Sequence, residues 1–189
     1  MSKFLSYGGD ALLSHVNPDF YRFNQDINNS HKTNCVNCAI ATDLSLQYIQ
    51  GVEVVLAPFS SYVSSTTTDR EIKYSALPST FKPVNEIEDL YPATFQDILT
   101  PEDIQEGSVN WNLTETLLMG MEKICSIVQG AGKKSRGVIY VQTENGNSGH
   151  VFNVWNKEGS IIEFLDGQNN KIVTGFLPKT SLVVLLLTS

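Results

Sequence analysis

Two segments of the chain place small or apolar residues at helical spacing. The first predicts a helix that starts at Cys35 and ends near Gly51, with Asn34 or Thr33 as its N-terminal cap. The residues that share one face are Cys35, Cys38, Ala39, Thr42 and Leu46. Small residues within this helix permit close packing, so we expect it to be the central helix of the fold.

The second helical pattern runs from residue 113 to 129. Asn112 is the expected cap, and Glu115 three residues later makes a capping-box-like pair with it. Gly130 and Gly132 then predict the end of the helix.

Beyond Gly132 the pattern changes to short apolar runs separated by turns, which predicts strands. The expected strands are residues 137–141, 150–155, 161–165, 171–173 and 181–187. Short turns between consecutive strands favour an antiparallel meander. Helices followed by strands indicate an α+β fold, with the N-terminal helix packed on an antiparallel sheet.

The N-terminal and middle segments carry weaker patterns. Residues 1–33 have no clean period and are expected to wrap the body, with a turn at Asn17 and Pro18. Residues 52–56 suggest a short strand, and the hydroxyl-rich run 60–68 suggests a loop. The prolines between residues 70 and 107 predict only short helices, such as one over residues 101–105.

The length of 189 residues favours one domain over residues 1–189. The net charge of −7 argues against nucleic acid as a partner, because proteins that bind it usually present a basic patch. The one basic cluster, residues 133–136, is expected to be a solvated loop between the second helix and the strands.

Three cysteines, an odd count, argue against a disulfide framework and suggest a reducing compartment. Residues 1–10 lack the apolar core of a secretory leader, so any export is expected to proceed without a cleaved leader. The longest apolar run, residues 182–187, is far shorter than the roughly 20 residues of a membrane span. No membrane span is therefore expected.

Candidate chemistry begins at Cys35. The reactive form of cysteine is the thiolate, which a helix N-terminus or a nearby imidazolium can stabilise. Cys35 stands where the first helix is expected to begin, so the unpaired N–H groups of the first turn can face its sulfur. The same groups can bind the oxyanion of a tetrahedral intermediate. Asn34, just before the cysteine, is assigned to this oxyanion and substrate-binding region.

The partners of the cysteine are expected on two later strands. If a hairpin turns near residues 157–159, residues near 150 pair with residues near 166, which places Asp166 beside His150. The carboxylate can then orient the imidazole and stabilise its charged form. Gly149 is expected to leave the backbone open for a substrate chain.

Each residue also has a plainer interpretation. Cys35 alone is more often a small buried residue, His150 alone a satisfied core or surface histidine, and Asp166 before a glycine a turn residue. Cys35 and Cys38 also match the CxxC spacing of redox and zinc sites. A redox role needs a thioredoxin-like context and zinc needs two more ligands, and neither is visible, so no metal or cofactor is expected.

Three segments resemble the papain-fold toxin domains of bacterial polymorphic toxins and effectors. They are Asn34 to Asp43, Gly149 to Val154, and Asp166-Gly167-Gln168. The order Cys, His, Asp is that of papain-like folds. The resemblance implies a papain-like fold over about residues 15–175, with Cys35 as nucleophile, His150 as acid and base, and Asp166 as its orienting group. Gln168 is expected near the site, and residues 60–110, long for the family, as an insert or recognition region.

The resemblance also implies a protein-glutamine deamidase, made in the bacterial cytoplasm and delivered by a specialised secretion system into a target cell. Its substrate is then a protein there, and an immunity or chaperone protein is a possible partner. The residues themselves leave other activities open: a papain-like cysteine protease, an acyltransferase, a transglutaminase, or an inert protein-binding module.

Overall fold

The computed structural model describes residues 12–18, 33–68, 71–79, 82–110, 113–143, 149–176 and 179–188. Its helices are α2 (Cys35–Ile49), α3 (Pro101–Asn110) and α4 (Leu113–Gly130), with short 3-10 turns η2 (Ala57–Phe59) and η3 (Val84–Ile87). The strands are β1 (Val63–Thr68), β2 (Glu71–Ala76), β3 (Gln96–Leu99), β4 (Arg136–Thr143), β5 (Gly149–Asn156), β6 (Ile162–Asp166), β7 (Lys171–Ile172) and β8 (Thr180–Leu187). The α+β class and both long helices are confirmed; the expected cap Asn112 lies outside the described residues.

The large sheet is antiparallel throughout, in the order β3-β8-β4-β5-β6-β7. Strands β4 to β7 form the expected meander. The last strand departs from the meander. Strand β8 pairs with β4 on the side away from β5, and its other neighbour is β3. This return carries the end of the chain back beside the middle of the sheet.

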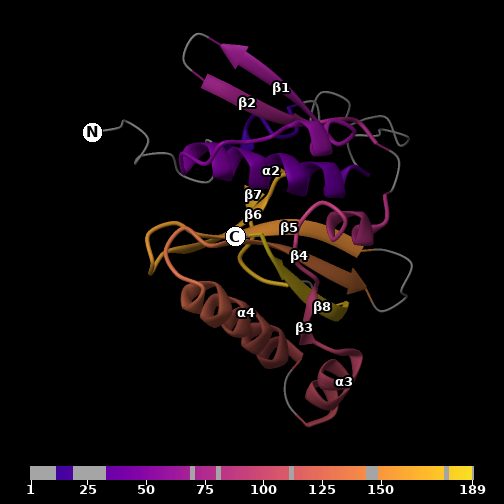
Figure 1. Cartoon of the computed structure of the whole chain (residues 1–189). Helices are drawn as coiled ribbons and strands as arrows, with labels where there is room; N and C mark the ends of the chain where they lie inside the picture. Colours follow the sequence, from indigo (N-terminus) through magenta and orange to yellow (C-terminus); the bar gives the residue numbers. More distant parts are fainter. Residues whose placement is uncertain are drawn as a thin grey trace.

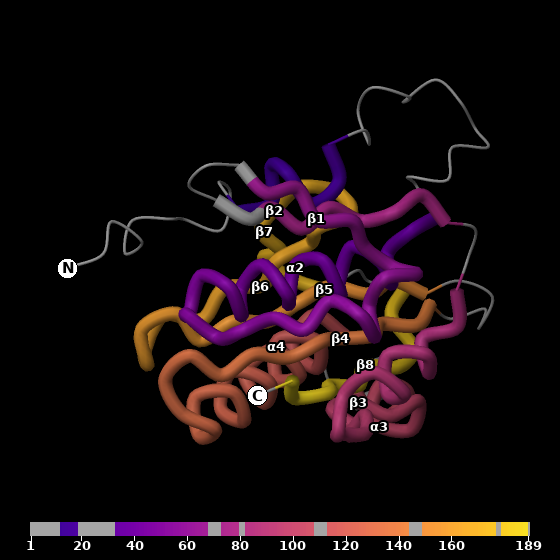
Figure 2. Tube along the Cα trace, turned by 45° about the horizontal axis from the view of Figure 1, so that its top comes forward, coloured from indigo at the N-terminus to yellow at the C-terminus, as the bar shows by residue number. Residues whose placement is uncertain are grey.

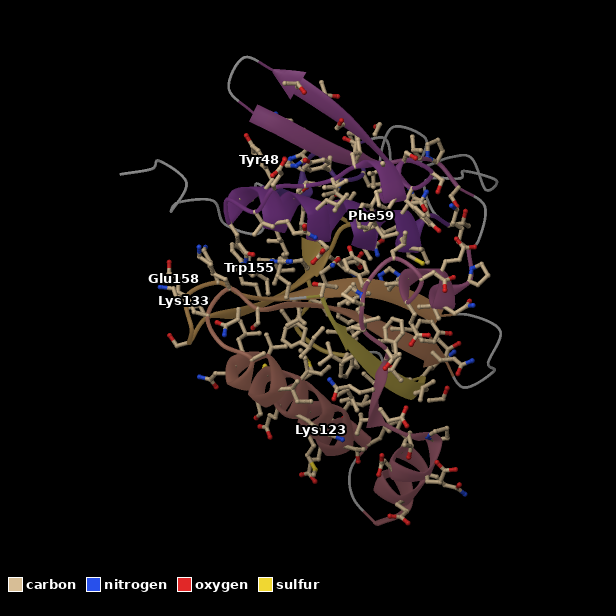
Figure 3. The ribbon with its side chains drawn as sticks, in the orientation of Figure 1. Tyr48, Phe59, Lys123, Lys133, Trp155 and Glu158 are labelled. Carbon is tan, nitrogen blue, oxygen red and sulfur yellow. The ribbon has the colours of Figure 1, made fainter. Side chains whose placement is uncertain are left out.

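Figure 1 shows the hairpin β1–β2 above α2, the large sheet below α2, and α4 below the sheet. Figure 2 shows the same order from another angle, with α2 over β4 and β5. Alternate side chains of β5 point to the two faces of the large sheet. Val151 and Trp155 join the core beneath α2, whereas Phe152 and Val154 join the core against α4. Figure 3 places Trp155 between α2 and the sheet, as this alternation requires.

Helix α2 is enclosed along most of its length, in agreement with the expected central helix. Every residue from Cys35 to Leu46 is buried, because the sheet covers one side of the helix and the β1–β2 hairpin covers the other. A helix that is enclosed in this way needs no amphipathic pattern. Small residues such as Ala39 and Ala41 allow the two layers to approach it.

The middle of the chain holds the largest departures from expectation. Residues 52–56 form no strand, and Val52 and Val55 are exposed. The hydroxyl-rich run expected as a loop is strand β1 instead, paired with β2 from Val63 to Thr68. β-Branched threonine suits a half-exposed strand, and the buried side chains Val63 and Tyr74 pack the hairpin toward α2.

Residues 60–110 are also more closely integrated than an insert on the surface of a core. Strand β3 forms one edge of the large sheet, and Ile87 and Tyr91 belong to the core around α2. Helix α3 starts at Pro101 as expected but extends to Asn110, well beyond residue 105. A role of this region in recognition stays a prediction.

A buried charge lies in the middle of α2. Asp43 has no exposed surface, and its Oδ1 is 3.0 Å from Nε of Arg136, which is also buried. The Asp43 carboxylate also accepts hydrogen bonds from Gln47, Tyr91 and Thr188. The expectation that residues 133–136 form a solvated loop is therefore wrong for Arg136, which begins β4 and ties the sheet to α2.

We predict that Asp43→Asn lowers the free energy of unfolding by about 3–5 kcal/mol, because Arg136 would keep a buried charge without its partner. The amide nitrogen would also face donors, since all four partners of Asp43 donate to it. Urea denaturation measures the change. Asp89→Asn is the matched control, because Asp89 is exposed and its replacement should change stability by less than about 0.5 kcal/mol. Equal effects of the two substitutions would contradict the anchoring role of Asp43.

Candidate functional site

The site begins at the first residue of α2. Cys35 is 7% exposed, and Asn34 before it occupies the N-cap position without a side-chain capping bond. The amide of Asn34 is used elsewhere: Nδ2 donates to the Leu77 carbonyl at 3.4 Å, and Oδ1 accepts from the Cys38 thiol at 3.3 Å. Asn37 donates to the same carbonyl at 2.8 Å. These bonds hold the start of the helix against the residue that follows β2.

His150 lies near the start of β5 with 32% of its side chain exposed. Its Nε2 is 2.9 Å from Oδ2 of Asp166. Cys35 lies near the same imidazole, because its hydrogen bonding and its charge are among the causes that raise the pKa of His150. The imidazole also stacks on Phe152 at a centroid distance of 6.0 Å. The structure thus brings together the three side chains that the sequence singled out.

Asp166 ends β6 and is held by its own turn. Its Oδ1 accepts the backbone N–H groups of Gln168 and Asn169, each at 3.1 Å. Its Oδ2 accepts the side-chain amide of Asn169 at 2.7 Å in addition to His150. The turn is fixed to the N-terminal segment, because the buried amide of Asn17 donates to the Gln168 carbonyl at 3.0 Å. The carboxylate is therefore fixed before any substrate binds.

These contacts set the charges of the pair. Burial by itself lowers the pKa of His150, but the hydrogen bonds to Asp166 and Cys35 and the charges of both outweigh it and raise the pKa to about 9. Burial by itself raises the pKa of Asp166, but the bonds to His150 and Asn169 outweigh it and lower that pKa. His150 is thus an imidazolium at neutral pH, near the Cys35 sulfur and oriented by a carboxylate. This arrangement is able to stabilise a thiolate nucleophile.

The second thiol of the motif is different. Cys38 is fully buried, and this burial, followed by the charges of Cys35 and Asp166, raises its pKa well above the usual value. It therefore stays a neutral thiol within the core. Among the residues that the structure describes, no group of three or more histidine, cysteine or acidic side chains could hold a metal ion. Within the same residues, no helix is long and apolar enough to span a membrane.

The hairpin register differs from expectation by two residues. Asn153 pairs with Leu165 and Asn156 with Ile162, so the connecting turn is centred on Gly159, which has a φ of +85°. Asp166 is not directly opposite His150 and instead pairs with Lys171 of β7. The two side chains still meet because both lie beyond the paired part of β5 and β6, where Asp166 starts the turn into β7.

The space above Gly149 is also not open, contrary to expectation. A methyl group on its Cα would lie 2.3 Å from Cε2 of Tyr140 and 2.6 Å from the tyrosine hydroxyl. Gly149 is therefore needed for the tyrosine ring rather than for free access of a chain. Gln168 is buried and contributes backbone bonds to the Asp166 turn. Substrate-binding roles for Asn34, Gly149 and Gln168 stay predictions.

Two residues at the site were missed from the sequence. Asn169 follows the Asp166-Gly167-Gln168 motif directly, and the tendency of an Asp–Gly turn to be capped by nearby amides could have indicated it. Tyr140 gave no local signal. It comes near Cys35 only because β4 pairs with β5 and places Tyr140 opposite Val151.

A family model described as "Papain fold toxin 1, glutamine deamidase" matches residues 33–171 of the 189, a range that includes Cys35, His150 and Asp166. Neither the curated proteins nor the solved structures yield a significant match.

We predict that His150 titrates near pH 9 in the native protein, and that Asp166→Asn lowers this pKa because it removes the charge and strongest acceptor that favour the imidazolium. NMR of the imidazole protons measures it, with the His150 signal identified by its loss in His150→Gln. Asp97→Asn, an exposed carboxylate on the edge strand β3, is the control and should leave the titration unchanged.

The same shift has a consequence for stability. Because the folded pKa lies above the ordinary 6.5, the imidazolium contributes its full stabilisation below pH 6.5 and loses it as the pH rises through about 9. Titration of His150 at or below pH 6.5 in the native protein would contradict the ion-pair assignment.

Proposed function

This chain belongs to the papain-fold toxin family described as glutamine deamidases, and we propose that it converts a glutamine of a target protein to glutamate through Cys35, His150 and Asp166. The observation that carries the proposal is that Cys35 lies near an imidazole whose Nε2 is 2.9 Å from a buried carboxylate. A thiolate beside an imidazolium that a carboxylate holds in place is the arrangement needed for attack on an acyl carbon.

In the first half of the reaction Cys35, as the thiolate, attacks the carbon of the glutamine side-chain carboxamide. The C–N bond breaks, and the His150 imidazolium gives its proton to the departing nitrogen, which leaves as ammonia. A thioester remains on Cys35, and the imidazole is neutral. Asp166 keeps the ring oriented during this transfer.

In the second half a water molecule attacks the thioester carbon. Neutral His150 takes one proton from the water, the C–S bond breaks, and the glutamate side chain leaves the enzyme. The thiolate–imidazolium pair is restored. The net change is one amide and one water converted to a carboxylate and an ammonium ion.

The choice of glutamine rests on the family and not on the three side chains. A thiol, imidazole and carboxylate equally support peptide hydrolysis, acyl transfer or transglutamination. The family description favours the deamidase among these reactions. By the same argument we propose a protein substrate inside a target cell, reached by a specialised secretion system, and an immunity or chaperone protein as a partner of the toxin.

We predict that Cys35→Ala reduces ammonia release from unfolded casein and from short glutamine peptides by at least about 10⁴-fold, because the nucleophile is lost. Mass spectrometry of the substrate locates the amide-to-acid change. Cys125→Ser is the matched control: this thiol is half-buried on α4, and burial raises its pKa, so its replacement should leave the rate unchanged.

Two results would contradict the proposal. Cleaved substrate chains in place of the amide-to-acid change would indicate a protease. Undiminished ammonia release by Cys35→Ala would remove Cys35 from the reaction.

We further predict that kcat/KM for ammonia release falls as the pH rises through about 9, because deprotonation of His150 removes the acid that protonates the leaving nitrogen. In Asp166→Asn this alkaline limb should move to lower pH, since the pKa of His150 falls. Initial rates between pH 6 and about pH 10 measure both profiles. An alkaline limb that does not move in Asp166→Asn would contradict the assignment of His150 as the acid.

A further inference from the structure

Tyr140 has no role in the reaction steps above, and its ring lies against Gly149, next to His150. Tyr140 is in β4, opposite Val151 of β5, and its neighbour Val141 is opposite His150. The ring of Tyr140 covers Gly149, the residue just before His150, so closely that a single methyl group on Gly149 would meet both the ring and the hydroxyl. The phenol therefore lies directly against the backbone of the strand that carries His150.

The hydroxyl of Tyr140 has unused bonding capacity. The residue is half-buried, and its hydroxyl makes no hydrogen bond within the part of the chain that the structure describes. Burial first, and then the charge of Cys35, raises the pKa of Tyr140. The phenol therefore stays protonated at neutral pH and is able to donate a hydrogen bond. It is also close enough to Cys35 for the charge of the sulfur to raise its pKa.

The reaction needs a hydrogen-bond donor near the carbon that Cys35 attacks. When the sulfur adds to the carboxamide, negative charge develops on the substrate oxygen, and donors already aimed at it stabilise the transition state. The first-turn N–H groups of α2 are one source. The amide of Asn34, the nearest side chain in sequence, is directed to the Leu77 carbonyl and to Cys38 instead.

We propose that the Tyr140 hydroxyl donates a hydrogen bond to the carboxamide oxygen of the substrate and, with the first-turn N–H groups of α2, forms the oxyanion site. This inference rests on the proposed function. Tyr140 is then a catalytic residue, and Gly149 is the residue that admits its ring.

The test is Tyr140→Phe, which keeps the ring over Gly149 and removes only the unbonded hydroxyl. We expect kcat for ammonia release from the glutamine peptides to fall about 10²–10³-fold, the effect of removing one oxyanion donor. KM should change little, because the bond is strongest in the transition state. The rate of alkylation of Cys35 by iodoacetamide should be unchanged, since that reaction forms no oxyanion.

The matched control is Tyr48→Phe. Tyr48 is in the last turn of α2, about 20 Å along the helix from Cys35, and its replacement should leave every readout unchanged. Urea denaturation of both variants separates a loss of folding from a loss of the donor.

A second readout needs no turnover. Butanal adds to a thiol to form a hemithioacetal whose oxygen occupies the oxyanion position, so protection of Cys35 from iodoacetamide by butanal reports the donor directly. We expect protection to require about ten-fold or more butanal in Tyr140→Phe, equivalent to loss of a hydrogen bond of about 1.4 kcal/mol.

The outcomes separate the two proposals. If the native protein releases no ammonia but butanal protection weakens in Tyr140→Phe, the deamidase proposal is wrong and the Tyr140 donor is supported. If kcat and butanal protection are both unchanged in folded Tyr140→Phe, the donor is overturned while the deamidase proposal is unaffected. Equal losses in alkylation and in kcat would also overturn it, because the hydroxyl would then act on the thiol and not on the substrate.

Discussion

The buried ion pair between Asp43 and Arg136 is the constraint on which the rest of the molecule depends. A buried carboxylate requires partners, and Asp43 obtains them from β4, from the Tyr91 region and from the end of the chain. The pair therefore holds the middle of α2 against the sheet. Because a helix is stiff, the pair also sets the position of Cys35, eight residues and about 12 Å closer to the N-terminus. Replacing such a pair by apolar residues is often tolerated, but removing one partner alone is not.

The site is assembled where three separately held elements meet. The start of α2 is tied to Leu77 through Asn34 and Asn37, and β5 is held in the centre of the sheet between β4 and β6. The turn after β6 is fixed by its own backbone bonds to Asp166 and by Asn17 from the N-terminal segment. No single element carries two of the three reactive side chains. Such a site is organised before the substrate arrives, which is the condition under which positioning and electrostatic stabilisation contribute to rate.

The thiols of Cys35 and Cys38 stand about one helical turn apart, and both are buried, but their neighbours differ. Cys38 faces the core, where desolvation and neighbouring negative charge disfavour its thiolate. Cys35 meets an imidazole whose positive charge is maintained by Asp166. A CxxC spacing thus yields one thiol paired with a base and one inert thiol. The difference arises from the neighbours of each side chain, because both belong to the first turns of the same helix and experience its dipole.

The sequence by itself determined the α+β class, both long helices, the strands from β4 to β8, and the three side chains that meet. These depend on local periodicity and on pairing between neighbours in the chain, which a sequence displays directly. The β1–β2 hairpin, the return of β8 to β4, the burial of Arg136 and the approach of Tyr140 to Cys35 were decided only in three dimensions. In each case the stabilising contacts come from residues that are far away in the sequence. The hydroxyl-rich run forms strand β1 because its hairpin with β2 packs on α2. Arg136 is buried because it pairs with the buried carboxylate of Asp43.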